Sequence, residues 1–196
     1  IKKAGPIAAP SANLSGRPSP TSAKHVIQDL NEKVDIIIDG GDSDIGLEST
    51  VLNLTSKIPT ILRPGAVTLE QLKEILGNVE VVKIHSNQEV KSPGMKYTHY
   101  APKAKVLIAN KKDIQKIINK ERKTGKVGVI SFSQYIADDI FQVSSLENLA
   151  KNLFKFFREF DSSKMNTIVV ESVPETGIGL AIMNRLKKAA GKDFAP

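Results

Sequence analysis

The chain has 196 residues, of which 40% are hydrophobic and 25% are charged, and this composition excludes a disordered or fibrous protein. It has no cysteine, and its three histidines lack the spacing of metal ligands, so we expect any metal to arrive with a substrate. No apolar run reaches the roughly 20 residues of a membrane span and no signal-peptide pattern is present, so we expect a cytoplasmic protein without a membrane partner.

The stretch from Gly5 to Thr21 is rich in glycine, proline and small hydroxyl residues, and it is predicted to be a shaped loop. Its prolines stiffen the backbone without making it helical or paired. Ser19 or Thr21 is placed to cap the helix that follows, and hydroxyl groups beside a helix N-terminus favour a bound anion. A proline-rich surface turn with a helix cap is the alternative interpretation, and composition does not separate the two.

The next part of the chain is predicted to mix short helices and strands, from the spacing of apolar residues and from β-branched runs. The predicted elements are helix 21–31, a buried strand 34–39, a strand that ends the segment 45–54, strand 58–62, helix 68–77 with a capping box and a buried apolar stripe, and strand 79–84. Ser49 lies at the irregular start of its strand. Pro64 and Gly65 break the following strand, so Arg63 is held at a strand end.

From His85 to Pro102 the periodic pattern lapses, and the prolines and glycine there indicate an ordered linker at a domain boundary. Two of the three tyrosines, Tyr97 and Tyr100, lie in this linker. Aromatic side chains in a linker should dock on something, which is either the domain interface or a ligand.

Beyond the linker, strands and helices alternate regularly. The predicted strands are 105–109, 126–132, 140–143 and 166–171, and the predicted helices are 111–123, a short piece at 134–138, a helix capped by Ser145 with an apolar stripe to Phe160, and 179–190. Repeated strand–helix units predict a small doubly wound α/β domain with a parallel sheet. Gly177 and Gly179 resemble a dinucleotide loop only weakly, and too little chain follows for its acidic ribose ligand about 20 residues later.

The net charge of +7 comes largely from two regions. One lies between Lys103 and Lys126, and the other near the C-terminus contains Arg185, Lys187, Lys188 and Lys192. The spacing is typical of solvated helix faces, without interleaved aromatic residues. A polyanionic partner is the other interpretation, so a basic RNA-binding module without catalysis is an alternative function. It predicts binding to transfer RNA that weakens steeply with salt.

Four motifs in order carry a resemblance to a known family. They are residues 9–17 (APSANLSGR), 46–51 (GLESTV), 61–65 (ILRPG) and 93–102 (PGMKYTHYAP), and residues 181–185 also look like that family's C-terminal helix. Together they resemble the two-domain form of threonylcarbamoyl-AMP synthase. The resemblance implies an α/β fold with the C-terminal half of a YrdC-like twisted-sheet catalytic domain at 1–84, an ordered linker over the active site at 85–104, and a Rossmann-like domain at 105–196.

The family is known to join L-threonine, bicarbonate and ATP into threonylcarbamoyl-adenylate and pyrophosphate, the first step towards threonylcarbamoyladenosine in transfer RNA. The resemblance therefore implies a nucleotidyltransferase with ATP as substrate, Mg²⁺ carried by the ATP, and a downstream threonylcarbamoyl transferase that acts on transfer RNA. Such a reaction mainly needs anions to be positioned and shielded. No side-chain nucleophile is required, which agrees with the absence of a nucleophile motif here.

The resemblance also assigns site residues. The ATP contacts are Ser11, Asn13, Ser19, Arg63 and Tyr100. The threonine contacts are Ala9 and Ser49, and Tyr97 and His99 would close the pocket from the linker. Each residue also has a structural interpretation. Ser19 would be a helix cap, Ser49 a strand-edge residue bonded to backbone, and Arg63 a surface residue.

The first residue is Ile1, whereas the family's catalytic domain has an N-terminal half with a lysine and arginine pair that grips the triphosphate. We therefore expect this chain to be the C-terminal portion of such an enzyme. If it is the whole polypeptide, we expect weak nucleotide binding and no turnover. The sequence of the C-terminal domain shows no cluster of catalytic residues of its own. Two roles are therefore open for this domain: it supports a lid, or it forms an oligomer interface.

Overall fold

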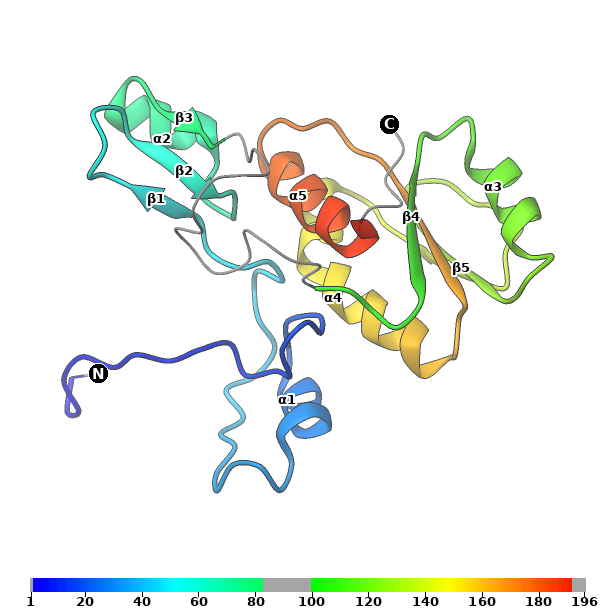
Figure 1. Cartoon of the computed structure of the whole chain (residues 1–196), viewed down its shortest axis with the longest axis horizontal. Helices are drawn as coiled ribbons and strands as arrows, with labels where there is room; N and C mark the ends of the chain where they lie inside the picture. Colours follow the sequence, from blue (N-terminus) through cyan, green and yellow to red (C-terminus); the bar gives the residue numbers. More distant parts are fainter. Residues whose placement is uncertain (1, 83–99, 192–196) are drawn as a thin grey trace.

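The computed structural model describes residues 2–82 and 100–191, which form two groups of elements (Figure 1). The first group is α1 (Ala23–Leu30), β1 (Val51–Asn53), β2 (Thr60–Arg63), α2 (Leu69–Leu76) and β3 (Glu80–Val81). The second is β4 (Lys105–Ala109), α3 (Ile114–Glu121), β5 (Val127–Ser131), β6 (Asp139–Gln142), α4 (Leu146–Ser162), β7 (Thr167–Glu171) and α5 (Ile178–Ala190). The predicted α/β class is confirmed.

The second group is a parallel sheet between two helical layers. Its strand order is β4-β7-β5-β6, and every neighbouring pair is parallel. Successive strand residues face opposite sides, so Ile168 and Val170 pack with α4 and α5, while Val169 packs with α3. Figure 1 shows α3 on one side of the sheet and α4 and α5 on the other. The predicted parallel α/β unit is confirmed, although 134–138 forms no helix.

Helix α4 forms as its sequence predicts. The Ser145 hydroxyl accepts a hydrogen bond from the backbone N–H of Asn148 at 3.1 Å, which caps the helix. Phe154, Phe157 and Phe160 recur at helical spacing and are completely buried in the core, as expected.

The first group has a smaller sheet, in which β1 pairs antiparallel with β2 and β2 pairs parallel with β3. The capping box of α2 is confirmed, because Thr68 and Gln71 each accept a backbone N–H of the other. The expected buried stripe of α2 is wrong: no α2 residue is buried and Ile75 is 81% exposed. Capping depends on local residues, whereas burial needs a packing neighbour. Leu69 and Leu72 of the stripe are half-buried, and Leu76 is exposed like Ile75.

The strand expected at 34–39 is also wrong. This segment is irregular, and Ile36 and Ile38 are 78% and 87% exposed. β-branched residues favour a strand only where a neighbour completes the hydrogen-bond ladder. In the described part of the chain no strand pairs with this segment.

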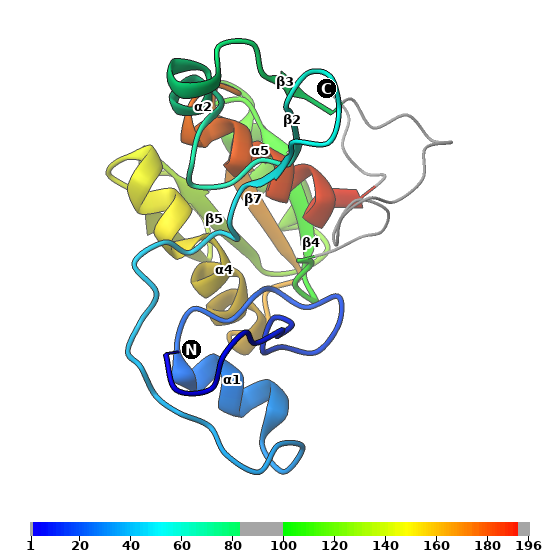
Figure 2. The ribbon, with the colours of Figure 1, turned by 90° about the vertical axis from the view of Figure 1, so that its left-hand side faces the viewer.

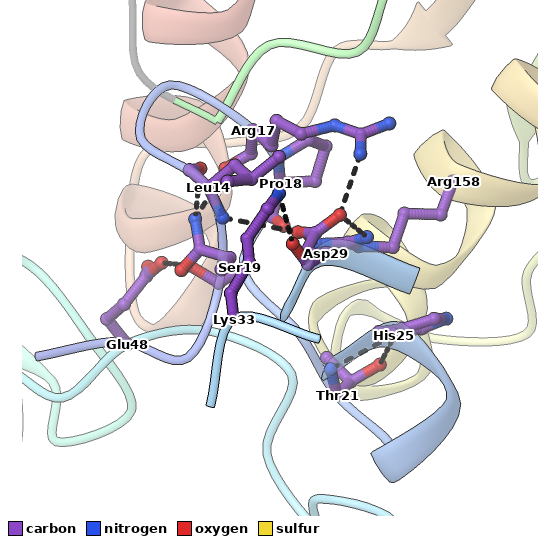
Figure 3. Close-up of polar contacts among 11 residues, drawn as sticks. Leu14, Arg17, Pro18, Ser19, Thr21, His25, Asp29, Lys33, Glu48 and Arg158 are labelled. Atoms are coloured by element: carbon purple, nitrogen blue, oxygen red, sulfur yellow. Dashed lines mark hydrogen bonds and ion pairs between the residues drawn. The ribbon is translucent and has the colours of Figure 1, made fainter. Parts of the chain in front are cut away.

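A buried carboxylate joins the first group to the second (Figure 3). Asp29 of α1 is 1% exposed and lies between two guanidinium groups. Arg158 of α4 contacts both Asp29 oxygens, at 2.7 and 3.2 Å, and Arg17 contacts one at 2.7 Å. Arg158 also donates to the carbonyl oxygen of Pro18. These contacts fix the opening loop and α1 against α4.

The loop before β1 packs against the same helix (Figure 2). A Cβ atom on Gly46 would lie 2.0 Å from the backbone oxygen of Lys151 in α4, so only glycine allows this approach. Leu47 follows and enters the core formed by α4 and α5. The two groups therefore share a hydrophobic core as well as an ion pair.

We predict that Asp29→Ala lowers the free energy of unfolding by about 3–5 kcal/mol, because it leaves the buried Arg158 without a counter-charge. Denaturant unfolding measures this loss. Asp35→Ala is the matched control, since Asp35 is exposed, and it should have little effect. Equal stability of the Asp29 variant and the parent would show that the pair does not hold the groups together.

We also predict that Gly46→Ala lowers the free energy of unfolding by about 1–3 kcal/mol through overpacking against α4. Gly40→Ala is the control, because a Cβ on Gly40 meets no atom within 4 Å and its φ angle is not in the left-handed region. Thermal unfolding of the two variants gives the comparison. Equal melting temperatures would exclude a tight contact at Gly46.

Candidate functional site

Four of the predicted site residues lie where the two groups meet. Ser19 belongs to the opening loop, Ser49 to the segment before β1, Arg63 ends β2, and Tyr100 precedes β4. They are far apart in the sequence. Two residues that the sequence reasoning missed, Glu48 and Arg185, connect Ser19 to Tyr100, and Ser49 follows Glu48 directly in the chain.

Glu48 links the opening loop to α5. The Ser19 hydroxyl donates a hydrogen bond to Oε1 of Glu48 at 2.5 Å, as Figure 3 shows. Nε of Arg185 donates to Oε2 of the same carboxylate at 2.7 Å, and Arg185 is 0% exposed. Ser19 caps no helix, because the N-cap of α1 is Ser22, so the capping role expected for Ser19 or Thr21 is wrong.

Arg63 is held against Ser49 at the end of β2. Its Nε donates to the Ser49 backbone oxygen at 3.1 Å, and its Nη2 donates to the Ser49 hydroxyl oxygen at 3.4 Å. The contact needs a close approach of two backbones, because a Cβ on Gly65 would lie 2.3 Å from the backbone nitrogen of Thr50. The motifs 46–51 and 61–65 thus form one unit.

Tyr100 is buried between the two groups, with a left-handed φ of 68°. Its ring stacks on Phe154 at 5.4 Å between centroids, and the Arg185 guanidinium lies 5.3 Å from the ring centroid. The Ala101 N–H donates to the Gly16 carbonyl at 3.2 Å, which joins the opening loop to the chain before β4. Burial, and then the Glu48 charge, raises the pKa of Tyr100 above its ordinary value, so its hydroxyl stays protonated at neutral pH.

The site carries an excess of positive charge. Burial, with Arg185 and Arg63 nearby, lowers the pKa of Lys188 to about 8. Arg185 also keeps one buried nitrogen, Nη2, without a hydrogen-bond partner in the described residues. Three cations therefore lie near a single carboxylate, that of Glu48, an arrangement that favours an anionic ligand.

The remaining predicted site residues are Ala9, Ser11, Asn13, Tyr97 and His99. Nδ2 of Asn13 donates to the carbonyls of Leu14 and Arg17, while its Oδ1 is buried without a partner in the part that the structure describes. Ser11 and Ala9 are exposed, and the described structure shows no hydrogen bond from the Ser11 side chain. Tyr97 and His99 lie outside the described residues, as does most of the predicted linker.

The expectation that Arg185 and Lys188 lie on a solvated helix face is wrong, because α5 packs on β4 and on Tyr100. A signal for this was present in the sequence. Arg185 shares a helix face with Ile182 and Ala189, at the spacings i−3 and i+4, and that face is buried. The charged residues between Lys103 and Lys126 are by contrast largely exposed, as predicted.

A separate cleft of about 880 Å³ lies between α1 and α4. Its lining includes His25, Asp42, Lys151 and Lys155, and none of the predicted site residues that lie in the described ranges. Within the described ranges no group of three or more histidine or acidic residues could hold a metal. No helix there is both long and apolar enough to cross a membrane.

Comparison with known proteins shows which family this chain resembles. The sequence model of the C-terminal domain of threonylcarbamoyl-AMP synthase matches residues 67–191, and that of the Sua5, YciO and YrdC proteins, described as telomere recombination, matches residues 1–65. The threonylcarbamoyl-AMP synthase of Pyrococcus abyssi is 46% identical over 95% of this chain and 58% of the relative. That of Bacillus subtilis is 48% identical over 97% of this chain and 59% of the relative.

A crystal structure of Pyrococcus abyssi Sua5 complexed with L-threonine superposes with a TM-score of 0.88 at 44% identity. It covers 94% of this chain, and this chain covers 58% of it. The chain thus spans somewhat more than half the length of these relatives, and the comparisons do not confirm the expectation that it is only a C-terminal portion. They do confirm the resemblance carried by the motifs: the chain belongs to the threonylcarbamoyl-AMP synthase (Sua5) family.

Proposed function

We propose that the protein forms threonylcarbamoyl-adenylate from L-threonine, bicarbonate and ATP, with release of pyrophosphate. The observation that carries the proposal is a cluster of contacts with an excess of positive charge. Glu48 and Arg185 link Ser19 to Tyr100, and Arg63 is held by Ser49, the residue after Glu48. The names of the relatives and the threonine bound to the Pyrococcus abyssi structure support it.

The proposed chemistry suits the groups present. The threonine amine and bicarbonate yield a carbamate and water, and a carbamate oxygen then attacks the α-phosphorus of ATP and displaces pyrophosphate. The carbamate and ATP are both anions, so the protein's task is to hold negative charges together in the right geometry. Arg63 is permanently charged and anchored by Ser49, and Lys188 adds charge below a pH of about 8.

In this proposal each site residue has a role. Ser11, Asn13, Ser19, Arg63 and Tyr100 contact ATP, and Mg²⁺ enters with the nucleotide. Ser49 and the backbone of Ala9 contact threonine, and Tyr97 and His99 close the pocket. The buried Oδ1 of Asn13, which lacks a partner among the described residues, supports a ligand beside the opening loop.

We also propose the division into 1–84, the linker 85–104 and 105–196. Pairing of β3 with β2 supports it, because it places residues 80 and 81 in the sheet of the first group. The product adenylate would serve a threonylcarbamoyl transferase that acts on transfer RNA, which is also our reason for proposing a cytoplasmic protein.

Pyrophosphate release by the complete gene product tests the function. We expect release that requires ATP, threonine and bicarbonate together. Release that is independent of threonine would contradict the proposal. No release, together with salt-sensitive binding to transfer RNA, would instead favour a basic RNA-binding module.

We predict that Arg63→Ala weakens ATP binding at least about 10-fold, because it removes a positive charge and its charge-assisted hydrogen bonds from the site. Isothermal titration with ATP measures the change. Arg122→Ala is the control, because Arg122 is an exposed arginine that pairs with Asp138 in the second group of elements. Unchanged ATP affinity in the Arg63 variant would remove Arg63 from the nucleotide site.

We predict that Ser49→Ala raises the KM for threonine about 5- to 10-fold, through loss of one hydrogen bond, and leaves the KM for ATP nearly unchanged. Steady-state pyrophosphate release gives both constants. Ser56→Ala, an exposed turn residue, should alter neither. An effect of Ser49→Ala on the KM for ATP alone would assign Ser49 to the nucleotide instead of threonine.

A further inference from the structure

The hydrogen bond between Ser19 and Glu48 restricts what Ser19 offers to a ligand. Glu48 is ion-paired with Arg185 through Oε2, and its two carboxylate oxygens act as acceptors. A serine hydroxyl has one proton, and in this structure it points to Oε1 of Glu48. The lone pairs of the Ser19 oxygen are what remains for a ligand, so Ser19 presents an acceptor.

Because Ser19 presents an acceptor, it can form a hydrogen bond only with a part of the nucleotide that carries a donor. The phosphate oxygens of ATP are ionised acceptors at neutral pH, and two acceptors do not form a hydrogen bond. The hydrogen-bond donors of ATP lie in its nucleoside half. They are the two ribose hydroxyl groups and the amino group of adenine.

Arg185 keeps this arrangement in place. It is fully buried, its Nη1 donates to Oδ1 of Asn184 at 2.8 Å, and its guanidinium lies over the Tyr100 ring. Glu48 is therefore held by a side chain that has little freedom to move. The orientation of Ser19 in the opening loop thus depends on a residue of α5, which is 137 positions along the chain from Glu48.

We propose that Ser19 accepts a hydrogen bond from the nucleoside half of ATP, and that Arg185 is the positioning residue that makes Ser19 an acceptor by fixing Glu48. This rests on the proposed function, which places ATP at Ser19. It divides the nucleotide between two parts of the site, with the nucleoside at Ser19 and the phosphates at Arg63. It also gives the C-terminal domain a role in nucleotide recognition.

Isothermal titration of the complete gene product with four nucleotides tests the proposal. The probes are ATP, 2′-deoxy-ATP, 3′-deoxy-ATP and purine riboside triphosphate, which lacks the adenine amino group. Ser19→Ala should weaken ATP binding about 5- to 10-fold. With the one analogue that lacks the donor facing Ser19, the Ser19→Ala variant and the parent should bind with equal affinity. The identity of that analogue shows whether the donor is the 2′-hydroxyl, the 3′-hydroxyl or the amine. A loss of equal size with all four nucleotides would overturn the acceptor role.

The role of Arg185 is tested in the same titration. Arg185→Met should weaken ATP binding in the parent but add little in the Ser19→Ala background, because both changes remove the same contact. Lys187→Met, on the same helix but in an exposed pair with Glu175, should leave affinity unchanged. Full additivity of the Ser19 and Arg185 changes would overturn the positioning role.

Two outcomes separate this inference from the proposed function. If the parent protein does not bind ATP, the proposed function and this inference both fall. If the parent binds ATP and the Ser19→Ala loss does not depend on the analogue, only this inference falls. If Arg185→Met unfolds the protein, Glu48→Gln gives a second test. The glutamine amide can itself donate a hydrogen bond to the Ser19 oxygen, so it competes with the nucleotide donor and should weaken ATP binding. This loss should be absent with the analogue that shows no loss for Ser19→Ala.

Discussion

The arrangement of this molecule depends on the carboxylate of Asp29, which is buried between two guanidinium groups. Asp29 and Arg158 are almost completely shielded from solvent, so neither tolerates separation from the other. Burial raises the pKa of Asp29, but the hydrogen bonds and charges of Arg158 and Arg17 lower it below its ordinary value overall. Stability from this pairing is thus present above the ordinary pKa of aspartate and is lost as the pH falls through the lowered value.

The pairing determines where the opening loop lies. Asp29 anchors α1 to α4, and Arg158 also binds the carbonyl of Pro18, the residue before Ser19. A second ion pair, between Glu48 and Arg185, joins the other motif segment to α5. The candidate site therefore lies between the two groups of elements, and helices α4 and α5 of the second group hold the two segments that form it. The second group of elements thus contributes to the candidate site through these contacts.

The sequence predicted best the features that depend on local residues. Helix α4 has a capping serine and an apolar stripe, and the strands of the parallel sheet are short β-branched runs bounded by turn residues, so each carries its own signal. The 34–39 strand failed because strand formation depends on a partner. The prediction that Ile75 is buried was wrong for the same reason, because burial also depends on a packing partner, although the predicted cap of its helix was correct. In α1 the buried residues are His25 and Asp29, and Ile27 of the apolar side is half exposed.

Only part of the candidate site was predicted, because its other residues depend on partners that are distant in the sequence. Motif resemblance assigned Ser19, Ser49, Arg63 and Tyr100, but composition described Arg185 only as one charge among many near the C-terminus. A buried arginine is stable only with a specific partner, and Glu48 lies in another domain. The most direct test of a site shared by the domains is a crystal structure of the complete gene product with a non-hydrolysable ATP analogue. We expect the phosphates at Arg63 and a nucleoside donor at Ser19. A nucleotide bound in the cleft between α1 and α4 would contradict a shared site.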